Sequence, residues 1–339
     1  MAGERQHYLP QFLQRGFADA EGFVWLFRKN EHGRRVRTRN VGVERTFYTK
    51  GNDPTVDDVI TTAEAKFSRI IRTLRASQPG QLDSGSLPEL FAHLEVRTRH
   101  LRQAFQQTTE SLYSKAIPIL GDTEKLKRLL VNDIAKNPEK ISQFVREELQ
   151  RKGLPESATA AVAKEITDRL PEVLEESGPE LKRASTNILS ALPETLRTSI
   201  KDAHNKALSK TIAPQFRVQN YEQLDFRTED VPDGNTFLGD CGTIFHVEGS
   251  KPFKTITDKN DITLAAILPI APTRLLIGAK PRYRVNPQDI RTAIARCSLE
   301  FFIASEDSDE NAALANLIGL DAPLLTDDQI QDVVDEASS

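Results

Sequence analysis

The feature that most constrains the fold of this chain is a change in the spacing of its apolar residues. Over residues 57–74 they recur at helical intervals, along a stripe that includes Phe67 and Ile71. Residues 120–212 are rich in Lys and Glu, poor in aromatic residues, and helical in pattern nearly throughout. After Pro214 the chain breaks into short β-branched and aromatic runs separated by Gly, Pro and Asp. Helical and strand patterns in separate segments predict an α+β fold.

The short apolar runs are expected to be β-strands. Residues 23–28 and 35–43 flank a turn in which Gly33 supplies a permissive backbone, and this pattern predicts a β-hairpin. The later expected strands are residues 216–218, 236–238, 243–247, 263–268, 274–277 and 301–303, with a helix over 287–299. We therefore expect an N-terminal arm and hairpin, with helices, packed on a C-terminal mixed or antiparallel sheet, together with a helical insertion.

The changes in pattern divide the chain into four parts. They are an N-terminal part with arm, hairpin and helices (1–119), a helical subdomain (120–212), a β-rich part that completes the core (213–305) and an acidic tail (306–339). In the tail, Thr326 followed by Gln329 is a capping box, which predicts a short helix there.

Composition narrows the class of protein. A charged fraction of 28% and a hydrophobic fraction of 38% are typical of a soluble globular protein. No segment approaches the roughly 20 apolar residues of a membrane span, and the first residues lack the apolar stretch of a signal peptide. Two cysteines, Cys241 and Cys297, are too few for a disulfide framework and suit a reducing compartment. We expect a cytoplasmic protein without a membrane partner.

The net charge of −4 conceals an uneven distribution. Residues 306–339 hold ten acids and no Lys or Arg, so the rest of the chain carries a charge of +6. Basic residues gather around the hairpin, and the candidates for nucleic-acid binding are Arg28, Arg34, Arg35, Arg37 and Arg39. The alternative is a solvated, charged hairpin. The tail is either a solubilising terminus or a shield for the basic patch.

The N-terminal arm carries an unusual motif, His7-Tyr8-Leu9-Pro10. Pro10 fixes its own φ and favours an extended Leu9, so His7 and Tyr8 are presented on a stiff segment. With residues 41–44 (Val-Gly-Val-Glu), Arg97-Thr98 and residues 237–240 (Phe-Leu-Gly-Asp), this motif resembles the bacterial family known as domain of unknown function 4238. The resemblance spans roughly residues 5–305. It implies an architecture and no activity.

The chain departs from the pattern of that family at two positions. Arg99 follows Arg97-Thr98 where the resemblance leads us to expect a proline, a change that we expect to alter only a helix bend. Cys241 and Gly242 follow Asp240 where we expect a small polar residue and then a proline. The second departure affects the geometry of any site built on Asp240.

Five polar residues lie within the family-like segments: His7, Glu44, Glu64, Arg97 and Asp240. Such a set could form a hydrolytic site with His7 as the acid or base, and with carboxylates, above all Glu44 and Asp240, on Mg²⁺. Arg97 would then bind a phosphate. In the alternative interpretation His7 anchors the arm through hydrogen bonds, and Glu44 forms a structural salt bridge with Arg97.

Two functional hypotheses follow from these residues. The first is a metal-dependent, nuclease-like effector that hydrolyses phosphodiesters in a toxin or phage-defence system. The alternative is a non-enzymatic module that binds nucleic acid through the hairpin or a partner protein through residues 120–212. The sequence contains no G-x-S-x-G elbow, phosphate-loop pattern or dinucleotide fingerprint, which argues against serine hydrolases, kinases and hydride transfer. The residues leave open whether the protein is an enzyme.

Overall fold

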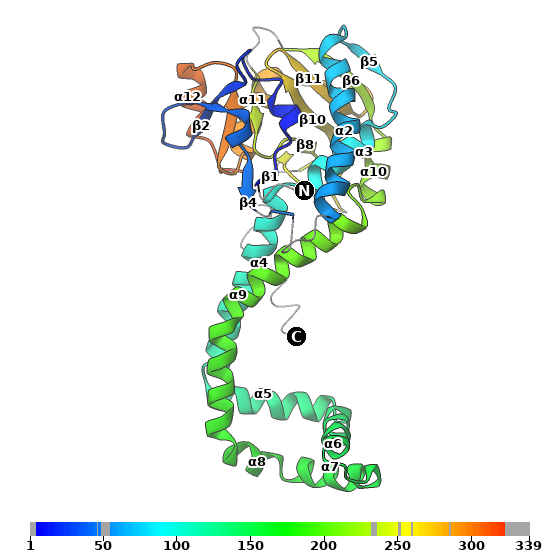
Figure 1. Ribbon diagram of the computed structural model, residues 1–339, viewed down its shortest axis with the longest axis vertical. Coiled ribbons are helices and arrows are strands. Elements are labelled where there is room, and N and C mark those ends of the chain that lie inside the picture. Colours follow the sequence, from blue (N-terminus) through cyan, green and yellow to red (C-terminus); the bar gives the residue numbers. More distant parts are fainter. Residues whose placement is uncertain are drawn as a thin grey trace. The chain divides into compact units, whose positions relative to one another are not determined.

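The computed structural model of the chain describes residues 5–45, 47–48, 55–231, 236–249, 252–258, 260–284 and 286–322. The chain divides into two compact units. Among the described residues, unit 1 comprises those in the ranges 5–106 and 200–322, and unit 2 comprises those in the range 107–199. Two long helices, α4 (Arg99–Leu120) and α9 (Gly178–Lys210), run from one unit into the other (Figure 1). The division therefore falls inside these helices, earlier in the chain than the limits of the segment 120–212.

Unit 1 contains a six-stranded antiparallel sheet in the order β5-β6-β11-β10-β8-β9. Its strands are β5 (Gly80–Leu82), β6 (Asp225–Asp230), β8 (Ile244–Val247), β9 (Phe253–Lys254), β10 (Thr263–Ala271) and β11 (Arg274–Ala279). Successive residues of β10 face opposite sides, so Ala266 and Leu268 join one apolar core and Ala265 and Ile267 join another. The central strands are buried on both faces, which explains their nearly continuous apolar sequence.

Helices pack on the two cores of this sheet. Besides the short α1 (Gln11–Gln14) and its portions of α4 and α9, the described part of unit 1 contains the helices α2 (Thr55–Ala76), α3 (Leu87–Val96), α10 (Gln215–Glu222), α11 (Pro287–Cys297) and α12 (Asp309–Ala315). Residues of α2 and α3 belong to the core that contains Leu268, and residues of α11 belong to the core that contains Ile267. In Figure 1, α2 and α3 lie beside the strands of the sheet. The α+β class predicted from the sequence is thus confirmed.

A second antiparallel sheet has the strand order β3-β2-β12-β7. It contains the predicted hairpin, β2 (Phe23–Arg28) with β3 (Arg34–Arg37), although β3 ends at Arg37 and not at residue 43 as expected. The sheet also includes β7 (Leu238–Gly239) and β12 (Phe301–Ala304). In the turn, Asn30 and not Gly33 has a positive φ, of 60°. Gly33 is required for a different reason, because a Cβ there would lie 2.7 Å from Asp307 Oδ1 and from the Phe27 ring.

The N-terminal arm is anchored at both ends. Strand β1 (Arg5–His7) pairs with β4 (Val43–Arg45), with His7 opposite Val43. The short helix α1 (Gln11–Gln14) then buries Phe12 and Leu13, and Phe17 follows at 1% exposure. These apolar side chains join the same core as α2, so the arm is part of the fold. Between β3 and β4 runs a 3₁₀ turn, η1 (Thr38–Asn40).

One expected strand is wrong. Residues 216–218 form part of α10, although Phe216 and Val218 favour strands. Phe216 is 56% exposed, whereas Tyr221, farther along the helix, is buried and stacks on Phe245 at 5.4 Å between ring centroids. Packing of Tyr221 in the core therefore overrides the local propensity.

Unit 2 consists of helices in the part of the chain that is described. Besides its portions of α4 and α9 it has α5 (Thr123–Lys136), α6 (Glu139–Arg151), η2 (Glu156–Ala158), α7 (Thr159–Asp168) and α8 (Leu170–Glu176). Its core is small, with Ile141, Val145, Leu149 and Ala163 at its centre. Among the described residues of both units, no helix has the length and apolar character needed to span a membrane. The helix expected from Thr326 and Gln329 lies outside the described residues.

Candidate functional site

A pocket of about 260 Å³ lies in unit 1, where the arm, the hairpin and the segment around β4 meet. Its lining residues are Tyr8, Leu26, Arg28, Asn40, Val41, Gly42, Val43, Glu44, Arg99, Glu300 and Phe301. The arm motif supplies Tyr8, and the Val-Gly-Val-Glu segment supplies the four residues 41–44. The pocket therefore gathers two of the segments on which the sequence resemblance depends, together with two arginines from elsewhere in the chain.

Two arginines share one carboxylate in this pocket. Glu300 Oε1 lies 2.6 Å from Arg99 Nη1, and its Oε2 lies 3.7 Å from Arg28 Nη1. The three side chains are each 35–36% exposed. Two guanidinium groups carry about ten N–H donors, whereas a carboxylate has about four lone-pair sites. The pair of arginines therefore offers more donors than Glu300 can accept.

Aromatic rings hold both arginines in place. The Arg28 guanidinium carbon lies 5.6 Å from the centroid of the Phe301 ring, and that of Arg99 lies 5.9 Å from the Tyr8 ring. Burial raises the pKa of the Tyr8 hydroxyl, and the Arg99 cation beside it acts in the opposite direction. Tyr8 therefore remains a neutral phenol, and it serves as a wall that orients Arg99.

Asp240 lies outside the pocket lining and fixes the backbone that carries Glu300. Its buried carboxylate accepts hydrogen bonds from the backbone N–H groups of Leu299 and Glu300, both at 2.7 Å, and of Phe301 at 3.3 Å. Burial raises the pKa of Asp240, while His100 and these N–H groups act against that rise. Asp240 thus positions Glu300 through the main chain.

Further cations surround the Glu44 side of the pocket. Arg5 donates to Asn40 Oδ1 at 3.0 Å, which places its guanidinium at the rim. Burial and the neighbouring Arg102 lower the pKa of Lys201, whereas the Glu44 carboxylate raises it. Glu44 is also among the charges that raise the pKa of Arg99 and of Arg102 against the effect of their burial. The lining of the pocket thus holds two arginines and two carboxylates, and the cations Arg5 and Lys201 lie beyond it.

Three of the five predicted catalytic residues meet in a separate, buried network. Arg97, 1% exposed, forms an ion pair with Glu64 and donates to the backbone oxygen of His7 at 2.6 Å. It also donates to the Tyr48 hydroxyl at 3.2 Å. The alternative pairing of Arg97 with Glu44 is wrong, because Arg97 at the end of α3 faces Glu64 of α2.

His7 anchors the arm. Its ring Nδ1 lies 3.0 Å from the Val41 oxygen, and Nε2 lies 2.7 Å from Gln11 Nε2. The only consistent assignment has Nδ1–H donating to Val41 and Nε2 accepting from the Gln11 amide. Burial lowers the pKa of His7, so the ring is neutral. Because both nitrogens are engaged, His7 has no lone pair free to act as a general base in this arrangement.

The predicted Mg²⁺ ligands do not fit a metal site in the described part of the chain. Both carboxylate oxygens of Asp240 accept backbone N–H groups, and Glu44 lies in a pocket that Asp240 does not line. Within the described ranges, no group of three His, Cys, Asp or Glu side chains could hold a metal ion. Mg²⁺ prefers carboxylates free to coordinate it, which Asp240 is not.

The predicted nucleic-acid-binding arginines fall into two groups. Arg34 pairs with Glu31 at 3.2 Å, and Arg35 pairs with Asp19 at 2.5 Å and with Glu21 at 2.7 Å. Arg37 and Arg39 belong with these residues, outside the pocket lining. The Arg37 guanidinium carbon lies 4.7 Å from the Phe23 ring centroid, and the backbone oxygen of Arg39 accepts a hydrogen bond from Arg5. Arg28 alone of the predicted set lines the pocket. The local ion pairs along β3 favour the solvated-hairpin interpretation for that strand.

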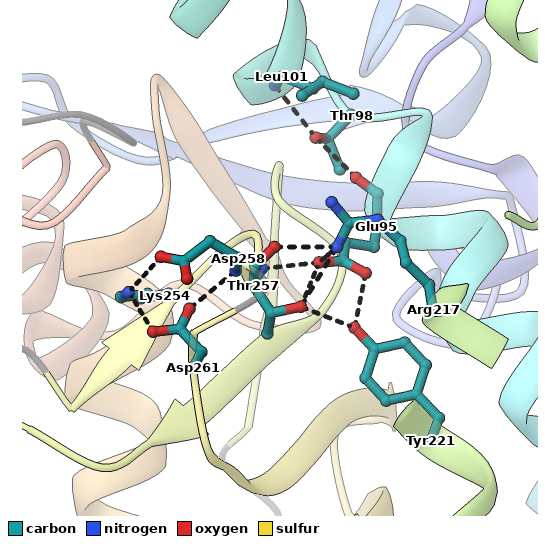
Figure 2. A network of polar contacts seen from close by, with 9 residues as sticks. All are labelled: Glu95, Thr98, Leu101, Arg217, Tyr221, Lys254, Thr257, Asp258 and Asp261. Atoms are coloured by element: carbon teal, nitrogen blue, oxygen red, sulfur yellow. Dashed lines mark hydrogen bonds and ion pairs between the residues drawn. The ribbon is translucent and has the colours of Figure 1, made fainter. Parts of the chain in front are cut away.

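A second polar network, around the buried Glu95 of α3, is shown in Figure 2. Glu95 accepts from Tyr221 Oη at 2.6 Å and from the N and Oγ1 of Thr257 at 2.7 and 2.9 Å, and it pairs with Arg217. The same view includes Lys254, Asp258 and Asp261, which form ion pairs beside Thr257. With both oxygens engaged, Glu95 ties α3 and α10 to the loop at Thr257 and acts as a structural residue.

Sequence reasoning missed Tyr8, Arg99 and Glu300 as pocket residues. Tyr8 belongs to the arm motif, so the motif itself was a signal. Arg99 was visible as a departure from the family pattern, although we expected it to change only a helix bend. Glu300 left no local signal, because it reaches Arg28 only through the pairing of β12 with β2.

Comparison with known proteins identifies the family. The model of the family described as "Protein of unknown function (DUF4238)" matches residues 5–309, and the chain belongs to this family. A search of curated proteins found no match, and neither did a search of solved structures.

Proposed function

We propose that this protein binds nucleic acid, and that the pocket between Arg28 and Arg99 is where it holds a phosphate group. The observation that carries the proposal is the convergence of these two arginines on one pocket around a single shared carboxylate, Glu300. The two residues come from different elements, the end of β2 and the start of α4. Their convergence is therefore a product of the tertiary fold.

The chemistry of the pocket suits a phosphate. A guanidinium presents its N–H donors in a planar fork that matches two phosphate oxygens. Leu26, Val41 and Phe301 line the same pocket, and apolar walls strengthen electrostatic attraction by excluding water. Arg5 at the rim and Lys201 near Glu44 add positive potential that would attract a polyanion.

Phosphodiester hydrolysis, with a role in a toxin or phage-defence system, stays a prediction from the sequence. So does recognition of a partner protein by the helical segment of residues 120–212. The binding proposal needs neither, since it draws only on the charges and the shape of the pocket. The binding proposal is closer to the non-enzymatic alternative than to the metal-dependent one, and it is supported by the hydrogen bonds that already engage both nitrogens of His7 and both oxygens of Asp240 within the protein.

The proposal is tested by fluorescence anisotropy with labelled single-stranded and double-stranded DNA and RNA. We expect Arg28→Gln and Arg99→Gln each to weaken binding about tenfold or more. Each should also lower the slope of log affinity against log salt by about one, because one phosphate contact is lost. The matched control is Arg151→Gln in unit 2, whose guanidinium is exposed and pairs with Glu148.

The control should bind like the parent protein, and thermal unfolding should verify that every variant is folded. Pocket variants that bind as tightly as Arg151→Gln, or a parent protein that binds none of the four nucleic acids at low salt, would contradict the proposed function.

A further inference from the structure

We propose that the pocket accepts the terminal phosphomonoester of a nucleic-acid strand, and that Glu300 competes with this group for Arg28 and Arg99. The inference rests on the proposed function, since it concerns the ligand of the same pocket. It comes from the place of Glu300 between the two arginines, from the charge of the groups that could replace it, and from the size of the pocket.

Glu300 occupies the position that a ligand oxygen would take. Its carboxylate lies against Arg99 at 2.6 Å and near Arg28 at 3.7 Å. An anion that enters the pocket must therefore displace it. The side chain is 35% exposed and can turn toward solvent, while its backbone N–H stays bonded to Asp240 at 2.7 Å. Displacement thus requires a rotamer change of one side chain and leaves the main chain in place.

The charge of the incoming group decides whether displacement is favourable. An internal phosphodiester carries one negative charge, so it exchanges one monoanion for another at Arg28 and Arg99. A terminal phosphomonoester carries about −1.5 to −2 at neutral pH and offers three acceptor oxygens. Only the terminal group brings a surplus of charge and acceptors over the carboxylate that it replaces. Glu300 imposes the same cost of displacement on both ligands, and the two arginines favour the phosphomonoester, which brings more charge and more acceptors to offset that cost.

The dimensions of the pocket agree with this ligand. At about 260 Å³ it lies just below the range of about 300–1,000 Å³ that is usual for small-molecule sites. The end of a strand fills such a space with a phosphate and part of a sugar. A strand that ends in the pocket needs one way out of it, whereas a strand that continues in both directions needs two between the lining residues of the arm, β2, β4 and β12.

The test compares three versions of one short, internally labelled single-stranded DNA: unmodified ends, a 5′ phosphate and a 3′ phosphate. We expect the parent protein to bind one phosphorylated version at least about tenfold more tightly than the unmodified strand. In Glu300→Gln the phosphorylated strand should bind several-fold more tightly than it does in the parent, and the preference over the unmodified strand should be kept, because the cost of displacing Glu300 is the same for every strand. The gain in affinity corresponds to the removal of one competing charge at close range.

Glu44→Gln is the matched control. It removes the same charge from the same pocket, but Glu44 does not lie between Arg28 and Arg99. We expect this variant to raise the affinity for the phosphorylated strand by less than about twofold, because no group between the two arginines is removed. If Glu44→Gln raises the affinity for the phosphorylated strand as much as Glu300→Gln does, bulk charge and not the placement of Glu300 is responsible, and the proposal is overturned.

The remaining outcomes separate this inference from the proposed function. If the parent binds all three strands equally and Arg99→Gln weakens all three, the pocket binds phosphodiesters and the terminal-phosphate inference is overturned alone. If neither the parent nor Glu300→Gln binds any strand, the proposed function fails as well. A loss of affinity for the phosphorylated strand in Glu300→Gln would show that Glu300 helps to bind the ligand, which also overturns the inference.

Discussion

Arg97 and Arg99 are two residues apart in the sequence, yet they belong to regions of opposite character. Arg97 is 1% exposed and is bonded to Glu64, to the His7 backbone and to Tyr48. Arg99 is 36% exposed and shares Glu300 with Arg28 at the edge of a pocket. The first arginine has its full set of partners within the protein, whereas the second has donors to spare. The role of an arginine in a motif segment, structural or ligand-binding, can therefore be assigned only once its partners are known.

The largest expected effect comes from substitution of Arg97, the buried one of the two arginines. Arg97→Met should lower the free energy of unfolding by about 3–5 kcal/mol, because it leaves Glu64 and the His7 oxygen without their donor. Arg99→Gln, a change at a partly exposed ion pair, should cost about 1 kcal/mol or less. Urea unfolding followed by circular dichroism measures both. Equal losses for the two variants would remove the distinction between the regions.

The second largest expected effect is a loss of stability of the buried region at acidic pH. Burial and the neighbouring Arg97 lower the pKa of His93 to about 3, and burial lowers the pKa of His204 to about 4. In the unfolded chain both titrate near their ordinary value of about 6.5. Their contribution to stability is therefore complete above pH ~6.5, and it is lost progressively as the pH falls toward the folded-state values.

We expect the free energy of unfolding to fall by up to about 1.4 kcal/mol per pH unit for each of these histidines below pH ~6. Urea titrations at a series of pH values measure this slope. His93→Gln should reduce it, with a corresponding loss of stability at neutral pH. A stability that stays constant from neutral pH down to pH ~5 would contradict the neutral, buried state of His93.

The smallest expected effect concerns the outer strand of the hairpin. Arg34 and Arg35 are paired with Glu31, Asp19 and Glu21, so little of their charge is available to a ligand. The double variant Arg34→Gln/Arg35→Gln should weaken nucleic-acid binding less than about threefold, compared with about tenfold or more for Arg28→Gln. If the order of the two effects is reversed, the basic patch of β3 is the binding surface and the pocket is secondary.

Much of the fold could be predicted because its signals are local. The stripe through Phe67 and Ile71 indicates α2, and the runs around Gly33 indicate the hairpin. The predicted strand at residues 216–218 was wrong because their helical conformation depends on the stacking of Tyr221 on Phe245, a contact between distant parts of the chain. Local patterns therefore predicted the secondary structure where buried positions repeat along one element. They failed where a contact with a distant residue determines whether a segment is helix or strand.

The site was less accessible to sequence reasoning. Tyr8 and Glu44 could be found because they lie in motif segments. Glu300 meets Arg28 only because Phe301 of β12 stands opposite Arg28 of β2, a register that depends on the whole sheet. His7 and Asp240 were chosen for their chemistry, yet the fold uses their polar atoms for hydrogen bonds to its own main chain. Residue type alone could not reveal that use.

The central claim, that the pocket arginines hold a phosphate, is tested most directly by a crystal structure of the protein with a 5′-phosphorylated trinucleotide. We predict the terminal phosphate between Arg28 and Arg99, the Glu300 carboxylate turned toward solvent, and the bonds from Asp240 to the backbone of residues 299–301 unchanged. A trinucleotide bound elsewhere on the protein, with Glu300 still between the two arginines, would contradict the account.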